Sequence, residues 1–236
     1  MDYQLTEEQR MLVDSLRAFV EQELLPYEAE TDKTGEVPPE LGERIKSKAI
    51  EMGFYAANMP EAVGGGGLDC VSLALMEREF GKTTYGLHGF VHRPSEILMA
   101  CEGEQIERYL LPCVRGDKME FFALTEPDAG SDIMSMRTRA ERKGGDWIIN
   151  GSKHFISAPV VADFAILFAS TGVDDTPRGK RKRITAFLVD AGEPGFTIER
   201  GPRCAAQRAY STYRLSFDGL RVPDSRILGE EGNGLE

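Results

Sequence analysis

Long hydrophobic runs are missing from this sequence. No stretch approaches the roughly 20 consecutive apolar residues that a membrane-spanning helix needs, and the polar, acidic start Met1–Glu8 is unlike a secretory signal. The 236 residues are nevertheless 41% hydrophobic, which is enough for a substantial core. We therefore expect a soluble globular protein without a membrane segment, located in the cytoplasm.

Cysteine and histidine are too sparse and scattered to suggest a metal centre. The four cysteines lack C-x-x-C spacing, and the three histidines have no suitably spaced ligand beside them. We expect free thiols in a reducing compartment and no metal site. A Ser-His-Asp hydrolase site cannot be assigned from these separations. The residues concerned are Cys70, Cys101, Cys113, Cys204, His88, His92 and His154.

Positive charge is also in short supply. The 28 lysines and arginines face 39 aspartates and glutamates, so the formal net charge is -11. This argues against a general nucleic-acid binder, because such proteins meet phosphates with lysine and arginine. One local exception is the basic run Arg178–Arg183, which lies between two apolar segments and is expected to form a loop.

The first half of the chain has helical periodicity. Apolar residues from Thr6 to about Glu23 recur at helical spacing, and Thr6 with Gln9 fits a capping box. Pro26 predicts the end of this helix, because proline lacks an N–H donor. Similar patterns predict further helices over residues 39–52, 71–80, 89–101 and 104–114.

Four consecutive glycines, Gly64–Gly67, interrupt this helical half. A glycine-rich turn suggests phosphate binding, but the Lys-Ser/Thr pair of a P-loop does not follow it. We therefore interpret the glycine run as a loop.

The second half has the pattern of short strands. After about Met119, β-rich runs alternate with turn residues, and Lys143–Asp146 carries a two-glycine hairpin signal. This predicts an α+β protein, with an N-terminal all-helical domain over residues 1–118 and an antiparallel β-barrel or sandwich domain over residues 119–236. The predicted strands cover residues 121–125, 137–142, 146–149, 164–169, 184–189, 196–199 and 212–217.

Two polar-tipped segments of the β half are the strongest candidate for a site. The strand Phe121–Thr125 runs into the turn Glu126–Asp132, and Ile149–Ser157 follows after a hairpin. Two such loops can converge on one ligand; Gly130 permits a close main-chain approach, and backbone N–H groups can meet an anion. Taken alone, the first loop is equally consistent with a strand that ends in a proline turn. Together, the two segments predict a cofactor site.

The same segments carry a family resemblance. Their motifs, in their order along the chain, resemble the acyl-CoA dehydrogenases, and the resemblance spans nearly the whole sequence. The combination is more specific than any single motif. The residues that carry it are Met59–Glu61, Asp69, Ala123–Pro127, Ala129–Asp132, Asn150–Lys153, Val222–Pro223 and Leu228–Gly229.

The resemblance implies an FAD-dependent enzyme that oxidises an acyl-CoA thioester to the trans-2-enoyl-CoA. It also implies an electron-transferring flavoprotein as partner and a homo-oligomer in the full-length form. In this family a third, helical domain carries the carboxylate base, so we expect no catalytic residue in this chain and a base beyond Glu236, with the sequence truncated before it. Two alternatives stay open: a flavin-dependent oxidase or monooxygenase of the same fold, and a non-catalytic ligand-binding or assembly subunit.

The roles of individual residues also come from the resemblance. Residues of the first loop would lie along the flavin ring and near its phosphate, and Ser131 would also face the acyl-CoA substrate. Phe155 would cover one flavin face, and the hydroxyl of Ser157 would donate toward N5. The family often has tryptophan and threonine at these two positions. The predicted cofactor-binding residues are Phe122, Leu124, Thr125, Gly130, Ser131, Phe155 and Ser157.

Three further charged features have two readings each. Arg93 is either a surface residue or a substrate-binding residue that contacts a carboxylated acyl group. The run Arg178–Arg183 is either a solvated loop or an attractor for the phosphates of CoA. Glu126 invites a general-base reading beside the cofactor loop, but the resemblance gives it no such role.

Overall fold

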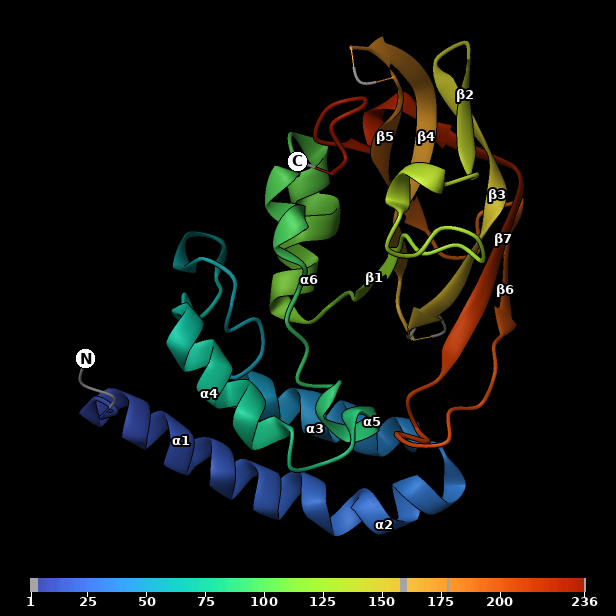
Figure 1. Cartoon of the computed structure of the whole chain (residues 1–236). Coiled ribbons are helices and arrows are strands. Elements are labelled where there is room, and N and C mark those ends of the chain that lie inside the picture. Colours follow the sequence, from blue (N-terminus) through green and yellow to red (C-terminus); the bar gives the residue numbers. More distant parts are fainter. Residues whose placement is uncertain (1–3, 158–160, 178, 236) are drawn as a thin grey trace. The chain divides into compact units, whose positions relative to one another are not determined.

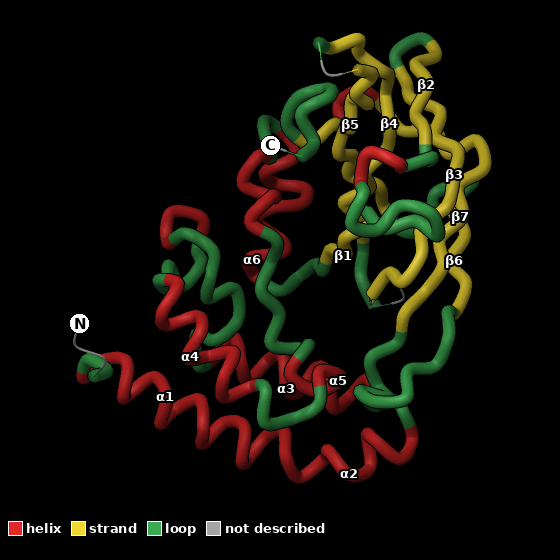
Figure 2. The backbone as a smooth tube through the Cα atoms, viewed as in Figure 1, coloured by secondary structure: helices red, strands yellow, loops and turns green. Residues whose placement is uncertain are grey.

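Helices occupy the first part of the chain and strands the second, as the sequence patterns predict (Figure 1 and Figure 2). The computed structural model describes residues 4–157, 161–177 and 179–235. The described residues form a helical unit and a sheet unit, and the chain passes between them more than once. The continuous domain boundary at residues 118 and 119 stays a prediction. The helical unit comprises the described residues up to Glu96, Val114–Asp117 and Cys204–Tyr210, and the sheet unit comprises Ile97–Cys113, Lys118–Arg203 and the residues from Ser211 onward.

The first helix begins as predicted but continues differently. Thr6 Oγ1 accepts a hydrogen bond from the N–H of Gln9, and Gln9 Oε1 accepts one from the N–H of Thr6, each at 3.1 Å, which completes the capping box. The prediction that Pro26 ends the helix is wrong. A π-helical turn follows α1, and α2 then begins with Pro26 in its first turn, where a missing N–H breaks no helical hydrogen bond.

The helical elements have the following bounds. The α-helices are α1 (Glu7–Phe19), α2 (Leu25–Thr34), α3 (Pro39–Glu51), α4 (Cys70–Phe80), α5 (Tyr85–His88) and α6 (Leu111–Arg115). The π-helical turns are η1 (Val20–Leu24) and η4 (Ile106–Leu110), and the 3₁₀ turns are η2 (Glu61–Val63), η3 (Glu96–Ala100), η5 (Ile133–Ser135) and η6 (Asp224–Arg226).

The predicted helix over residues 89–101 is wrong. Only the short elements α5 and η3 form around this region, because Pro94 disfavours helical backbone in the residue before it. Tertiary hydrogen bonds hold the irregular backbone instead: the N–H of Ala56 donates to the carbonyl of His92 at 3.0 Å, and Nδ2 of Asn58 donates to the carbonyl of Pro94 at 2.8 Å.

The glycine run Gly64–Gly67 forms a loop, as predicted. Its four N–H groups donate, at 2.9–3.1 Å, to the carbonyl oxygens of Glu61, Pro60, Ala56 and Met59. These donors are therefore engaged by the protein itself, so the structure gives no support to a phosphate cradle here.

Aromatic side chains join the helices of the helical unit. The ring of Phe19 on α1 lies edge-on to Phe54 and Phe80, with centroid distances of 5.5 and 6.3 Å. All three rings are buried, so the apolar face of α1 packs on α4 and on the segment after α3. Among the described helices, none is long and apolar enough to cross a membrane.

The second part of the chain forms one curled, mostly antiparallel sheet of eight strands in the order β6-β7-β3-β2-β4-β5-β8, with β1 paired to β4. β1 and β4 run parallel. The β2–β3 hairpin is confirmed: Lys143 pairs with Asp146, and Gly144 has a φ of 64°. The strands are β1 (Glu120–Ala123), β2 (Arg139–Lys143), β3 (Asp146–Ser157), β4 (Phe164–Thr176), β5 (Gly179–Asp190), β6 (Phe196–Arg200), β7 (Thr212–Pro223) and β8 (Ile227–Leu228).

Strand β4 is buried on both faces along its apolar half. Ala165 and Leu167 belong to the core of the curled sheet, whereas the ring of Phe164 on the other face contacts Tyr109 of η4 at a centroid distance of 4.7 Å. Burial on both sides explains the continuous apolar run, which does not alternate with polar residues as in a one-sided strand.

The expected loop at the basic run is wrong for its described part. Strand β5 begins at Gly179, and Arg178 lies outside the described residues. In the antiparallel register Lys180 is opposite Asp175 and Arg181 is opposite Asp174. Opposite charges across the strands favour this pairing, so tertiary context extends the strand into a polar sequence.

Candidate functional site

The first predicted loop leaves β1 and makes a tight turn. The N–H of Glu126 donates to the carbonyl of Ala129 at 2.9 Å, and the N–H of Ala129 donates back to the carbonyl of Glu126 at 3.2 Å. Gly130 and Ser131 follow this turn and are exposed. A side chain built at Gly130 would meet no protein atom within 4 Å, so the turn faces open space.

An apolar ring and a polar group precede the turn. Phe122 on β1 is 42% exposed, and its ring lies 4.7 Å from that of buried Phe168. Leu124 and Thr125 are half-buried. The strand thus presents one aromatic face and one hydroxyl beside the open turn.

The second predicted loop is a bulge within β3. The register with β7 shifts between Lys153 and Ile156, and Phe155 adopts a left-handed φ of 55° with 56% of its surface exposed. Positive φ is uncommon for a bulky residue, and a bulge is a common way to redirect a side chain. Ser157 at the end of the strand is half-buried.

The two loops meet at Thr125. The N–H of His154 donates to the carbonyl of Thr125 at 2.8 Å, which joins the bulge to the first loop. The hydrogen bonds of the described residues leave the hydroxyl of Thr125 unengaged. The structure thus brings the two predicted segments together through this hydrogen bond; that they bind one ligand stays a prediction.

A buried ion pair lies behind this junction. Nζ of Lys153 is 2.9 Å from Oε1 of Glu126, and their side chains are 0% and 4% exposed. The same Nζ donates to the carbonyl of Leu124 at 2.9 Å. The Glu126 carboxylate also accepts from the N–H groups of Arg137 at 2.6 Å and Thr138 at 3.0 Å. One lysine and one glutamate therefore connect β3, the first loop and the residues before β2.

Both members of this pair carry charge at neutral pH. Burial would raise the pKa of Glu126, but the hydrogen bonds from Thr138 and Arg137 and the charge of Lys153 outweigh it and lower the pKa. Burial lowers the pKa of Lys153 to about 8, while Glu126 acts in the opposite direction. A carboxylate that accepts three such hydrogen bonds is a weak base.

Sequence reasoning assigned Lys153 to a motif but gave it no role. A lysine between polar residues of a strand reads as a solvated side chain, because charged residues are rarely buried. In β3, Ile149 and Ile156 face the core, and the register shift against β7 between Lys153 and Ile156, which no local pattern records, puts Lys153 on the same buried side.

The charged substrate candidates are paired with acidic side chains. Arg93 belongs to the helical unit, is half-buried, and forms an ion pair with Glu77 of α4. Burial lowers the pKa of this guanidinium. In the basic run, Nε of Arg183 lies 3.6 Å from a carboxylate oxygen of Asp174. These cations therefore have acidic partners in the chain itself.

The donor set suits a flavin. Phe122 and Phe155 offer two exposed aromatic faces, Thr125 offers an unengaged hydroxyl, and the Gly130 turn leaves room for a ligand. Flat aromatic cofactors are held by stacking and by a few placed hydrogen bonds. Hydrogen bonds from Lys153 and His154 join β3 directly to Leu124, Thr125 and Glu126.

Both family models that match this chain describe acyl-CoA dehydrogenases. Residues 6–117 match the family model of the acyl-CoA dehydrogenase N-terminal domain, and residues 121–220 match that of the middle domain. Benzylmalonyl-CoA dehydrogenase of Aromatoleum aromaticum is 35% identical over 240 residues, which cover 99% of this chain and 61% of that protein.

The solved structures similar to this chain include acyl-CoA and glutaryl-CoA dehydrogenases. A putative acyl-CoA dehydrogenase from Mycobacterium smegmatis matches with a TM-score of 0.84 and 31% identity, over 98% of this chain and 60% of that one. A glutaryl-CoA dehydrogenase of the same organism in complex with FADH2 matches with a TM-score of 0.82 and 32% identity, over 97% of this chain and 57% of that one. The chain thus spans about 60% of the length of these relatives.

Proposed function

Because the chain belongs to the acyl-CoA dehydrogenase family, we propose that it forms the flavin- and acyl-CoA-facing part of an FAD-dependent enzyme that oxidises an acyl-CoA thioester to the trans-2-enoyl-CoA. The observation that carries the proposal is the junction at Thr125, where the two loops of the family motifs meet through the hydrogen bond from His154. The reaction is proposed for the full-length enzyme, since the chain spans about 60% of the length of its relatives.

Named residues would hold the cofactor. Phe122, Leu124 and Thr125 would lie along the ring, with the Thr125 hydroxyl and nearby N–H groups as hydrogen-bond donors to its polar edge. Bound FAD would supply the hydride-accepting chemistry of the oxidation.

The remaining predicted residues have distinct tasks. Phe155 would cover one face of the ring, and the hydroxyl of Ser157 would donate toward N5. The exposed turn at Gly130 and Ser131 would receive phosphate oxygens on its backbone N–H groups, and Ser131 would also contact the acyl-CoA.

The base that removes the α proton is expected outside these 236 residues. Glu126 directly follows Thr125 in the proposed flavin loop, and its carboxylate is held by Lys153 and two backbone N–H groups. Such a group holds its negative charge too tightly to take up a proton readily.

Flavin titration of the chain tests the proposal. We expect flavin fluorescence to be quenched on binding and the melting temperature to rise with FAD concentration, because a ligand that binds only the folded state stabilises it. Thr125→Val should weaken binding, whereas Thr176→Val, at the far end of β4, should not. A chain that shows neither response to FAD would sink the proposal.

Redox assays separate the alternative flavin functions. In the dehydrogenase, acyl-CoA should bleach the flavin of the full-length enzyme without consuming oxygen, and the enoyl-CoA should accumulate. Oxygen uptake in step with substrate would favour an oxidase or monooxygenase. A full-length protein that binds acyl-CoA but leaves the flavin oxidised would favour a non-catalytic subunit.

Arg93 is proposed to contact a carboxylated acyl group in the whole enzyme. Its half-buried guanidinium would exchange Glu77 for the carboxylate of the substrate. Arg93→Ala should reduce the rate on a carboxylated acyl-CoA relative to a plain one, with the exposed Arg115→Ala as control. Unchanged relative rates would overturn this assignment.

The partner and the assembly are also proposals. An electron-transferring flavoprotein would reoxidise the flavin, and the full-length form would be a homo-oligomer in the cytoplasm. Reoxidation that depends on the concentration of that flavoprotein, and the mass of the full-length protein in solution, test these two points.

A further inference from the structure

We infer that Glu126 and Lys153 are positioning residues that fix Thr125 in the orientation in which it meets the cofactor. The inference rests on the proposed function and adds to it two residues that contact neither ring nor substrate. Their geometry points to this role because Lys153 binds Leu124 and Glu126, the residues on either side of Thr125.

The peptide segment around Thr125 is held at three successive residues. Lys153 Nζ binds the carbonyl of Leu124, on one side of Thr125, and the carboxylate of Glu126, on the other side, each at 2.9 Å. The next residue of β3, His154, binds the carbonyl of Thr125 itself at 2.8 Å. The hydroxyl of Thr125 takes part in none of these bonds and remains available to a ligand.

The carboxylate anchors this arrangement to a third segment. It accepts from the N–H groups of Arg137 and Thr138, just before β2. Behind it, Gly151 has a φ of 148°, and a side chain there would approach Thr138 Oγ1 to 2.5 Å. The backbone at Gly151 is therefore in close contact with Thr138, whose N–H binds the Glu126 carboxylate.

The chemistry of the pair explains why both charges are needed. Glu126 accepts from three donors, which a glutamine could satisfy only with its single carbonyl oxygen. Lys153 supplies two hydrogen bonds from one atom, and a methionine of similar length supplies none. Burying this pair costs desolvation energy that a hydrophobic pair would not incur, so its presence favours a specific geometry over maximal stability.

The test compares four variants of the 236-residue chain: Lys153→Met, Glu126→Gln, Thr125→Val and the double variant Thr125→Val/Lys153→Met. We expect Lys153→Met to raise the dissociation constant for FAD about tenfold, the size of one charged hydrogen bond. In the Thr125→Val background, Lys153→Met should raise the dissociation constant for FAD only about threefold, because the hydroxyl that the pair positions is already absent. Hydrogen exchange of the His154 amide should accelerate in Lys153→Met without FAD.

Glu79→Gln is the matched control, because it removes a buried carboxylate with a lysine partner in the helical unit. It should lower the melting temperature but leave the FAD dissociation constant unchanged. If Lys153→Met and Glu79→Gln behave alike, the pair is merely structural and the inference falls.

Other outcomes are also decisive. Equal costs of Lys153→Met with and without the Thr125 hydroxyl would overturn the inference, as would unchanged His154 exchange and FAD affinity in Lys153→Met. If Lys153→Met does not fold, Glu126→Gln, alone and combined with Thr125→Val, gives the same comparison with a smaller change in shape. If the wild-type chain binds no FAD, the proposed function fails. In that case, unchanged His154 exchange in Lys153→Met would overturn the positioning role as well. Faster His154 exchange in Lys153→Met would still show that the pair fixes the backbone at Thr125.

Discussion

Gly151 lies where β3 passes closest to the residues before β2. Its φ of 148° and the 2.5–2.8 Å distances from a built side chain to atoms of Thr138 leave no space for a methyl group. The glycine of the Asn150–Lys153 motif is thus required by packing beside the ion pair.

Gly151→Ala should destabilise the chain by about 1–3 kcal/mol, because it introduces both backbone strain and overpacking. The free energy of unfolding in urea, followed by the fluorescence of the single tryptophan, Trp147, measures this. The control is Gly145→Ala, where a side chain meets nothing within 4 Å, and its change should stay within about 0.5 kcal/mol. Equal effects of the two substitutions would contradict the packing argument.

Phe155 combines unfavourable backbone with exposed apolar surface. Replacing it with asparagine, which tolerates the left-handed region, should raise the free energy of unfolding by about 0.5–1 kcal/mol. The same variant should bind FAD more weakly, because it lacks the ring.

Phe122→Asn is the comparison for this prediction. Phe122 is exposed to a similar degree but lies in regular strand, and it packs on Phe168. Its replacement should lower stability and FAD affinity together. A loss of stability in Phe155→Asn as well would show that the backbone at Phe155 is not strained.

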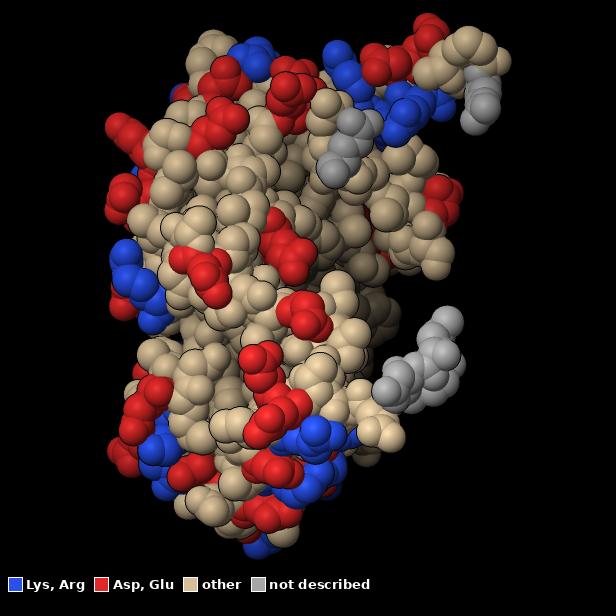
Figure 3. All heavy atoms as spheres, turned by 90° about the vertical axis from the view of Figure 1, so that its left-hand side faces the viewer, with Lys and Arg blue, Asp and Glu red and all other residues tan. Residues whose placement is uncertain are grey.

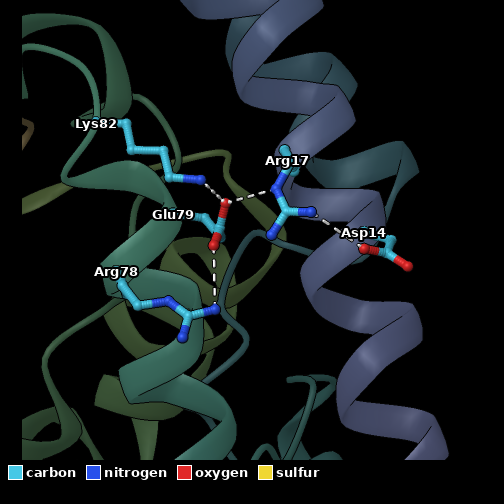
Figure 4. A network of polar contacts seen from close by, with 5 residues as sticks. All are labelled: Asp14, Arg17, Arg78, Glu79 and Lys82. Carbon is cyan, nitrogen blue, oxygen red and sulfur yellow. Dashed lines mark hydrogen bonds and ion pairs between the residues drawn. The ribbon is translucent and has the colours of Figure 1, made fainter.

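At the scale of elements, α1 and α4 are joined through a buried carboxylate. Glu79 of α4 is 1% exposed and lies between Arg17 of α1 and the cations Arg78 and Lys82 (Figure 4). Burial would raise the pKa of Glu79, but Lys82, Arg78 and Arg17 outweigh it and lower the pKa below its ordinary value of 4.5. The stability that Glu79 contributes is therefore present above about pH 4.5 and is lost as the pH falls through the lowered pKa.

Glu79→Gln should lower the free energy of unfolding by about 1–3 kcal/mol at neutral pH. The variant should also lose less stability than wild type as the pH falls below about 4.5. Urea unfolding from neutral to acidic pH, followed by helical circular dichroism, checks both effects. The control Glu43→Gln breaks an exposed pair with Lys46 and should change stability by less than about 0.5 kcal/mol. If the acid dependence of the Gln variant matches wild type, Glu79 is not the titrating group.

The elements also show where local patterns mislead. Pro26 is a valid stop signal, yet it also fits the first turn of a new helix, and only the following residues decide between the two. Over residues 89–101 the apolar spacing suggests a helix, but tertiary hydrogen bonds from Ala56 and Asn58 satisfy the backbone in another conformation.

At the scale of the whole molecule, the net charge of -11 opposes an anionic ligand such as a CoA ester. Figure 3 shows acidic and basic side chains close together on the face it presents. The basic residues of β5 follow the same pattern, because Lys180 and Arg181 are opposite Asp175 and Asp174. Their local field is therefore largely offset.

We expect the affinity for a CoA ester to rise as salt increases from about 20 mM to about 200 mM, because screening weakens the net repulsion. Calorimetric titration at several salt concentrations measures the sign of this dependence. The variant Lys180→Met/Arg181→Met should show a salt dependence of the same sign. An affinity that falls with salt in wild type, and not in this variant, would instead identify β5 as a phosphate attractor.

The sequence by itself determined the helical and strand halves, the hairpin at Gly144 and the two motif loops. Each of these depends on short-range periodicity or turn chemistry, which a local pattern records. Only the tertiary structure decided that Lys153 is buried against Glu126, that Phe155 sits on a bulge, and that the basic run extends a strand. Those features depend on which distant segments lie beside a residue, because burial and cross-strand pairing set the energy of a charge more than its neighbours in sequence do.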